Sequence, residues 1–249
     1  MVLSSRFPLT TSPGHPPSAR IAPWIATLSM AASMLRQRSS PGVSMSTSSS
    51  LWHASLADFQ HAVETRSTPG CGTAAALNGC LGLALILKGL RLHRGESSEP
   101  DRHRRRLIAE GDALQQALAE AVDDDAAAFD DYLQAQRRSN DDAAESDPCD
   151  SALDEAREAS IRIPLAAAER CREGLVLALE ALPLTSSAMR SDTLAGATML
   201  GAALEALVIG AEANLEALPV PATRQAMKAR CEALRGEAEE LRRRLGSDG

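Results

Sequence analysis

The longest helical pattern in this 249-residue chain lies between about Pro100 and Arg138. Apolar or small side chains recur there in steps of three, four or seven, which places them along one stripe of a helix. Continuing the stripe from Val122 by three residues, and from there by four to Phe129, puts Asp125 on the buried face. The stripe consists of Leu107, Gly111, Leu114, Leu118, Val122, Phe129 and Leu133.

The acidic run Asp123-Asp124-Asp125 therefore has one carboxylate that points inward. Asp123 and Asp124 turn away from the stripe, whereas Asp125 continues it. Burying an unpaired carboxylate costs several kcal/mol, roughly, so the group must be neutralised, paired with a donor, or kept for chemistry. The pattern alone leaves a structural acid and a catalytic acid both open.

Two further segments are apolar around the whole helix. Residues 74–87 contain Asn78 as their one polar side chain, and residues 193–211 carry Glu205 as their one charge. Helices of this kind are typically buried on every side. The first segment is short for a membrane span and rich in Ala and Gly, which favours a closely packed core helix.

The remaining segments predict amphipathic helices with recognisable ends. Ser55 begins a short capping-box helix, and Ser191 with Asp192 is expected to cap the helix that follows. A helix from Pro148, capped by Asp147, contains Pro164, which predicts a kink. The last helix spans residues 224–245. Together these segments predict an all-α bundle of long antiparallel helices, with two fully buried Ala/Gly-rich helices and a core completed by dimerisation.

Composition narrows the class of protein and its partners. Aromatic residues make up only 2% of the chain, which suits packed helices, and the formal net charge of -7 argues against a nucleic-acid partner. The five cysteines show no CxxC spacing, and no histidines are spaced four residues apart, so no metal is expected. No phosphate-binding or dinucleotide motif is present, which predicts that no cofactor is bound.

The first fifty residues have a different composition from the rest of the chain. They contain no Asp or Glu, and they are rich in Ser, Pro and Arg. Such a segment is expected to be disordered, either as an organelle transit peptide or as an over-extended start before Met45. The predicted domains are therefore residues 1–50 and a helical domain over residues 51–249. The predicted location is the cytoplasm, or an organelle matrix if the segment is a transit peptide, with no membrane association.

Three stretches of the chain, in this order, resemble the cyclodeaminase/cyclohydrolase family of one-carbon folate enzymes. Residues 68–76, TPGCGTAAA, are similar to the family's TPGGGS(V/A)AA turn into a buried helix. Residues 123–129, DDDAAAF, are similar to its DADAxAF. The third stretch is Arg190-Ser191-Asp192, which opens an Ala-rich helix that ends in Asn214-Leu215 and is similar to RSD…NL. The resemblance spans residues 56–245.

The resemblance implies an all-helical dimer and a site for a tetrahydrofolate substrate. The family's proposed catalytic aspartate falls on Asp125, the residue that the stripe already places inward. Matching motif positions imply that substrate is bound by Gly70, Gly72, Thr73, Arg190, Ser191, Asp192 and Asn214. Three positions depart from the family pattern: Cys71 replaces a glycine, Thr185-Ser186 replaces Gly-Asn, and Gly210 replaces an asparagine.

Two functions are expected from this resemblance. The first is a folate enzyme that hydrolyses 5,10-methenyltetrahydrofolate, or cyclises and deaminates 5-formiminotetrahydrofolate, with Asp125 as general acid and base. The lack of an attached formiminotransferase domain favours hydrolysis slightly. The alternative is a family member that kept the helical fold, lost folate chemistry and acts as an interaction or scaffold protein. The three departures from the family pattern motivate this alternative.

Overall fold

The computed structural model of the chain describes residues 50–92, 98–141 and 149–247. Within these ranges every regular element is helical and none is a strand, which confirms the all-α prediction. The long helices are α2 (Leu56–Thr65), α3 (Cys71–Leu92), α4 (Ser98–Asp141), α5 (Cys149–Ala181), α6 (Arg190–Asn214) and α7 (Pro221–Ser247). Short 3-10 turns join α5 to α6 and α6 to α7.

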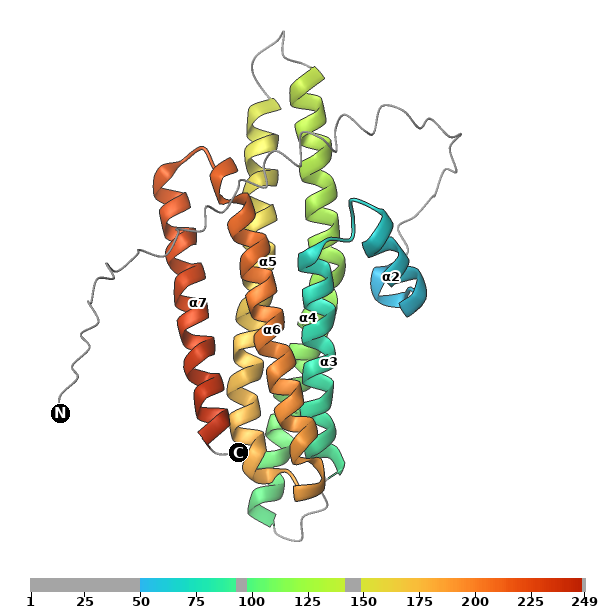
Figure 1. The fold of residues 1–249 in the computed structure, drawn as a ribbon, viewed down its shortest axis with the longest axis vertical. Coiled ribbons are helices and arrows are strands. Elements are labelled where there is room, and N and C mark those ends of the chain that lie inside the picture. Colours follow the sequence, from blue (N-terminus) through green and yellow to red (C-terminus); the bar gives the residue numbers. More distant parts are fainter. Residues whose placement is uncertain (1–49, 93–97, 142–148, 248–249) are drawn as a thin grey trace, which may run out of the picture. The chain divides into compact units, whose positions relative to one another are not determined.

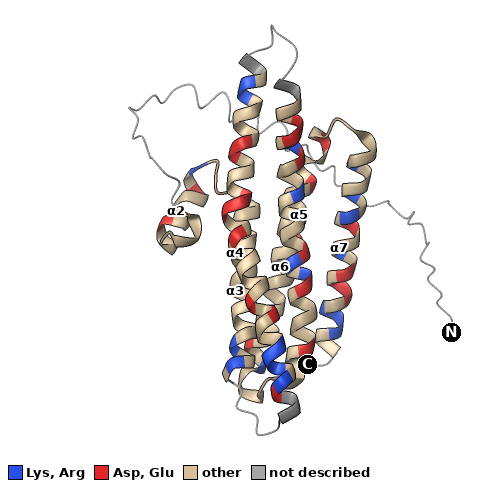
Figure 2. Cartoon of the chain, turned by 180° about the vertical axis from the view of Figure 1, so that it is seen from behind, with Lys and Arg blue, Asp and Glu red and all other residues tan. Residues whose placement is uncertain are grey.

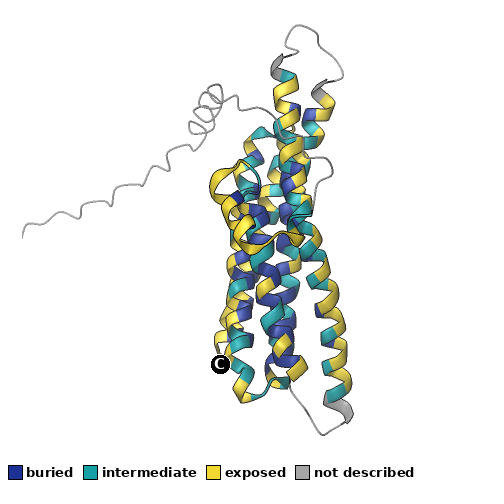
Figure 3. Cartoon of the chain, turned by 90° about the vertical axis from the view of Figure 1, so that its right-hand side faces the viewer, coloured by how far each residue is buried: buried dark blue, intermediate teal, exposed yellow. Residues whose placement is uncertain are grey.

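Four of these helices form an antiparallel ring. In Figure 1, α3 and α6 lie in front of α4 and α5, and each helix packs against the two that neighbour it in the ring. Helix α7 packs along α5 and α6. The core between the helices consists mainly of leucine side chains, and Figure 3 shows it as a buried strip along their inward faces. The largest fully buried residues include Leu83, Leu87, Leu118, Leu175, Leu200 and Leu234.

Helices α3 and α6 approach each other through glycine. A Cβ atom added at Gly82 would lie 2.7 Å from the carbonyl oxygen of Gly196, and one added at Gly196 would meet the carbonyl oxygen of Gly82. Real Cβ atoms do not pack against backbone oxygen at such distances, so the crossing requires both glycines. The Ala/Gly-rich composition of these two segments thus sets their spacing in the bundle.

The prediction that these two helices are buried on every side is wrong within one chain. Each helix leaves one strip of its surface exposed. Helices α3 and α6 form one side of the ring, and no other element of the described chain covers the outward strip of that side. Large apolar side chains are exposed on both, with Leu81 49% and Ile209 54% accessible. The strip consists of Leu81, Lys88, Leu92, Ala195, Thr198, Ala202, Glu205, Ile209 and Ala213.

By length and composition alone, α3 and the segment Ser187–Ala217 are apolar enough to cross a membrane. Their most apolar windows are 61% and 50% buried inside the bundle, as in the core helices of many helical proteins.

One of the predicted helix caps is confirmed by the structure and another is wrong. The side chain of Ser55 accepts a hydrogen bond from the Asp58 amide (3.1 Å), which confirms the predicted cap. The predicted cap at Ser191 is wrong, since α6 begins one residue earlier, directly after the 3-10 turn Ser187–Met189. Pro164 lies inside the continuous helix α5. Asp147 and the first fifty residues, apart from Ser50, lie outside the described residues.

Charged side chains concentrate on α4, α5 and α7, as Figure 2 shows. Two arginine-rich runs, residues 102–106 and 242–244, contribute exposed ion pairs. Arg106 pairs with Glu180 (2.8 Å), and Arg243 pairs with Glu240 (2.7 Å). Exposed pairs of this kind contribute little to stability, so packing of the apolar faces holds the bundle together.

The glycine contact between α3 and α6 yields a stability prediction. Gly82→Ala should destabilise the fold by about 1–3 kcal/mol, because the new methyl group must push the two helices apart. This corresponds to a loss of roughly 2–4 °C in melting midpoint for each kcal/mol. Urea denaturation followed by circular dichroism measures the effect.

Gly236→Ala on α7 is the matched control. No atom lies within 4 Å of a Cβ added there, so the substitution should raise stability by about 0.5–1 kcal/mol through helix propensity. Equal effects at the two positions would show that α3 and α6 do not depend on the glycine contact.

Candidate functional site

The side chain of Asp125 on α4 lies against the first turn of α3. The hydroxyl of Thr73 donates a hydrogen bond to Asp125 Oδ2 (2.8 Å), and the backbone N–H of Thr73 donates to the same carboxylate. Thr73 itself is fully buried, at 0% exposure. Asp125 is partly buried, in agreement with the inward position that the helical stripe predicts.

Gly72 allows the carboxylate to come this close. A Cβ atom at position 72 would lie 2.7 Å from Asp125 Cγ and closer still to Oδ1. Gly70 has a different surrounding, since nothing lies within 4 Å of a Cβ added there. The position of the Asp125 carboxylate therefore requires a glycine at position 72. No neighbouring atom requires a glycine at position 70.

Opposing effects act on the protonation of Asp125. Burial raises its pKa, and the two hydrogen bonds from Thr73 lower it. Burial is the larger effect, so the pKa of Asp125 lies above its ordinary value. A carboxyl group in this position changes protonation more readily near neutral pH than an exposed aspartate does, as general acid–base catalysis requires.

The neighbouring acids hold the chain that leads into α3. Asp123 accepts hydrogen bonds from the Ser50 hydroxyl (2.5 Å) and the Leu51 amide (2.6 Å), while Asp130 accepts one from Thr68 (2.5 Å). Asp124 is exposed. The Asp123 contacts anchor the segment before α2 to α4, and the Asp130 contact anchors the turn before α3. Of the three consecutive acids, Asp125 is the one that faces the first turn of α3.

The predicted site residues fall into two groups at opposite ends of α3. Gly70, Gly72 and Thr73 lie with Asp125 at its start. Asp192 lies near the other end, where it pairs with Lys88 (Nζ to Oδ2 2.6 Å). Fifteen residues of α3 separate Thr73 from Lys88, a distance of roughly 22 Å along the helix axis. One chain therefore does not bring Arg190, Ser191 and Asp192 to Asp125.

Asn214 belongs to the Asp125 end of the bundle. It lies one turn beyond Gly210, whose Cα faces the Cys71 side chain at the start of α3. Its side-chain amide donates to the backbone carbonyl of Ser160 on α5 (3.3 Å). The amide thus ties α6 to α5 near the site, and a ligand role for it stays a prediction.

Sequence reasoning missed the contact between Cys71 and Gly210. Both were singled out as departures from a family pattern, but nothing in the sequence places them side by side. The signal lies in the antiparallel packing of α3 and α6, which also pairs Gly82 with Gly196 and Asn78 with Met199. Knowing one of these pairs fixes the others.

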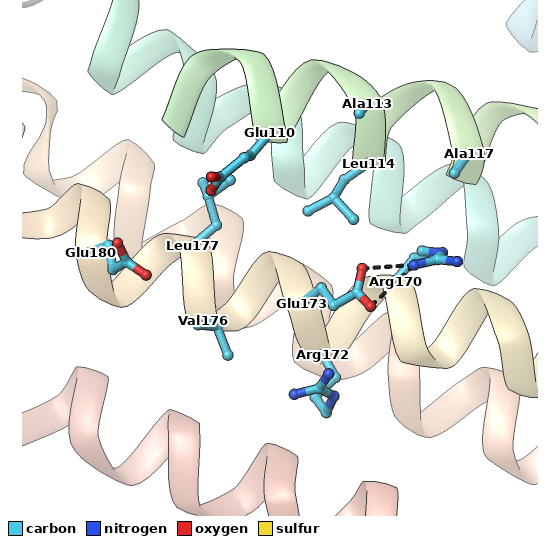
Figure 4. Close-up of a pocket in the computed structure, with 10 residues that line it drawn as sticks. All are labelled: Glu110, Ala113, Leu114, Ala117, Arg170, Arg172, Glu173, Val176, Leu177 and Glu180. Carbon is cyan, nitrogen blue, oxygen red and sulfur yellow. Dashed lines mark hydrogen bonds and ion pairs between the residues drawn. The ribbon is translucent and has the colours of Figure 1, made fainter. Parts of the chain in front are cut away.

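A shallow hollow of about 550 Å³ between α4 and α5 lies away from Asp125. Figure 4 shows the paired side chains of Arg170 and Glu173 on one side of it and Glu110 on the other, with Leu114 and Leu177 between the two helices. None of the predicted site residues lines it. In the described part of the chain, no three His, Cys, Asp or Glu side chains are grouped as metal ligands would be.

These features define an all-α antiparallel bundle with a buried carboxylate held at the start of a core helix. The sequence profile of formiminotransferase-cyclodeaminase matches residues 55–233. The chain belongs to the formiminotransferase-cyclodeaminase family.

Comparison with solved structures supports the fold. The formiminotetrahydrofolate cyclodeaminase of Thermotoga maritima is similar, with a TM-score of 0.69 over 78% of this chain and 95% of that one, at 17% sequence identity. Among curated protein sequences no match is found.

The geometry around Gly72 predicts the effect of a single methyl group. Gly72→Ala should displace the Asp125 carboxylate and lower the melting midpoint, because the added methyl group would overlap the carboxylate oxygens. Gly70→Ala, two residues away with open space around it, should leave the melting midpoint within error. If Gly72→Ala were as harmless as Gly70→Ala, the close packing of Asp125 on α3 would be wrong.

Proposed function

We propose that the chain is a one-carbon folate enzyme that acts through Asp125. It either hydrolyses 5,10-methenyltetrahydrofolate or cyclises and deaminates 5-formiminotetrahydrofolate, and it needs no bound cofactor. The observation that carries the proposal is the Asp125 carboxylate, whose pKa is raised by burial and which is held by Thr73. Membership of the formiminotransferase-cyclodeaminase family supports the substrate class.

In the hydrolytic direction, water attacks the cationic bridge carbon of the methenyl group. Asp125 stabilises the cation through its charge and accepts the proton of the attacking water. In the other direction, a folate nitrogen closes on the formimino carbon and ammonia leaves. That reaction requires a proton on the departing nitrogen, which the protonated Asp125 supplies.

The anionic end of the folate needs donors other than the first turn of α3. The amide of Thr73 already binds the Asp125 carboxylate, so the start of α3 is partly occupied by a negative group. A guanidinium is the side chain best suited to a carboxylate. Arg190 supplies one, but it lies at the far end of the bundle in the same chain.

We infer that a second copy of the chain supplies Arg190, Ser191 and Asp192. The exposed strip on α3 and α6 is mainly apolar, with Lys88 and Glu205 as its charged side chains and Thr198 as a further polar one. Glu205 already pairs with Arg235 (2.9 Å). A two-fold axis that crosses this strip near Leu81, midway along α3 between Thr73 and Lys88, would place one copy's Arg190 end beside the other copy's Asp125 end.

Substitution of Asp125 tests the chemical role. Asp125→Asn keeps the side-chain volume but removes the titrating proton. It should lower the reaction rate by about a hundredfold or more. The rate is measured as the loss of methenyltetrahydrofolate absorbance or as the release of ammonia from formiminotetrahydrofolate. Asp124→Asn, at an exposed position in the same run, should cost little. Full activity in Asp125→Asn would refute the assignment.

The pH dependence separates a catalytic from a structural carboxylate. Because the pKa of Asp125 is raised in the fold, its contribution to stability is present at low pH and is lost as pH rises through that pKa. Asn at this position does not titrate. The melting midpoint of Asp125→Asn should therefore rise relative to that of the wild type as the pH increases from about 4, the pKa of an ordinary aspartate, through the raised pKa of Asp125. A variant that unfolds at all pH values would instead mark the carboxylate as structural.

Mixed dimers test the shared site. Asp125→Asn and Arg190→Ala should each be inactive alone. After joint refolding, random pairing should restore about a quarter of wild-type activity, since half of the dimers contain one intact site. No recovery, or a stable monomer in light scattering at micromolar concentration, would refute the two-chain site.

The scaffold alternative predicts no folate binding. Titration calorimetry with a tetrahydrofolate derivative at millimolar concentration distinguishes the two functions. Heat of binding that is lost in Arg190→Ala supports the enzyme, and absence of heat in the wild-type dimer supports the scaffold.

A further inference from the structure

Cys71 and Gly210 face each other across the start of α3 and the last turns of α6. A Cβ atom added at Gly210 would lie 3.0 Å from Cys71 Sγ, and no other atom outside its own helix turn lies within 4 Å. The thiol is therefore the one obstacle to a side chain at position 210. Conversely, the thiol sits where it does because that position has no side chain.

The same thiol lies next to the Asp125 carboxylate. Gly72, the residue after Cys71, packs directly on Asp125. Burial and the charge of Asp125 both raise the pKa of the Cys71 thiol. The thiol is consequently neutral at physiological pH, so it acts through its shape and weak hydrogen bonding and not as a nucleophile.

Cys71 differs from the other cysteines of the described chain in being exposed. Cys80, Cys171 and Cys231 are buried in the core, and burial raises the pKa of Cys80 to about 12. These three pack the bundle. Cys71 is instead exposed beside Asp125, whose charge acts on its thiol, so a ligand that reaches the carboxylate from solvent would approach the thiol as well.

We propose that Cys71 and Gly210 form a matched pair at the rim of the Asp125 site. The Cys71 thiol contacts the bound folate there and limits the size of the one-carbon group that the folate can carry. The substrate contact rests on the proposed function, whereas the pairing of the two positions does not. The structure shows why the two positions belong together: the absence of a side chain at position 210 leaves room for the thiol at position 71.

A double-mutant cycle tests the pairing. Gly210→Asn alone should lower the melting midpoint by about 2 °C or more and change the labelling rate of Cys71, because the new side chain must displace the thiol. Cys71→Gly combined with Gly210→Asn should recover the midpoint, which makes the two changes non-additive. Gly236→Asn, where space is open, controls for asparagine in a helix. Additive effects of the two substitutions would overturn the pairing.

Thiol labelling tests the substrate contact. In a Cys149→Ser background, iodoacetamide at alkaline pH, where the thiolate forms, should modify Cys71 in the folded protein. Saturating 5-formyltetrahydrofolate, a stable probe, should slow this reaction about tenfold or more. Gly210→Asn should lower kcat/KM mainly through a higher KM, because the displaced thiol no longer lies where the substrate binds.

The outcomes separate this inference from the proposed function. Binding of the probe in calorimetry without protection of Cys71 would overturn the thiol contact and leave the folate function standing. No binding at all would overturn the folate function and the contact together, while the melting midpoints of the cycle still decide whether Cys71 and Gly210 form a pair.

Discussion

The close crossing of α3 and α6 is the constraint on which the rest of this structure depends. Gly82 and Gly196 let the two backbones touch, and this contact fixes how far one helix is shifted along the other. The shift places Cys71 opposite Gly210 at one end and Lys88 beside Asp192 at the other. A bundle of ordinary leucine-faced helices would keep its axes farther apart and would not define this register so closely.

The same bundle keeps the Asp125 carboxylate partly out of water. Asp125 is buried against α3, which costs free energy, and the hydrogen bonds of Thr73 offset only part of that cost. The extensive leucine core around Leu83, Leu118 and Leu200 supplies the compensation. Stability given up at a carboxylate in this way is typical of a site kept for chemistry.

Helical periodicity could predict the inward position of Asp125, because that position depends only on the spacing of residues within one helix. It could also predict the all-α class and most helix cores. It could not predict which residues of different helices meet, since that depends on crossing geometry, and so the Cys71–Gly210 contact and the separation of Arg190–Asp192 from Asp125 appear only in three dimensions. The Ser191 cap failed because a 3-10 turn shifted the start of α6.

The charges around Asp125 restrict what the site can hold. The carboxylate faces the positive end of α3, so the two largely neutralise each other before any ligand arrives. A cationic methenyl group bound beside the carboxyl would lower the pKa of Asp125 through its charge, whereas an uncharged folate would leave the raised pKa of the free site in place. Under the proposed function, the charge of the bound substrate therefore shifts Asp125 toward the role of a base with a cationic substrate and toward the role of an acid with a neutral one.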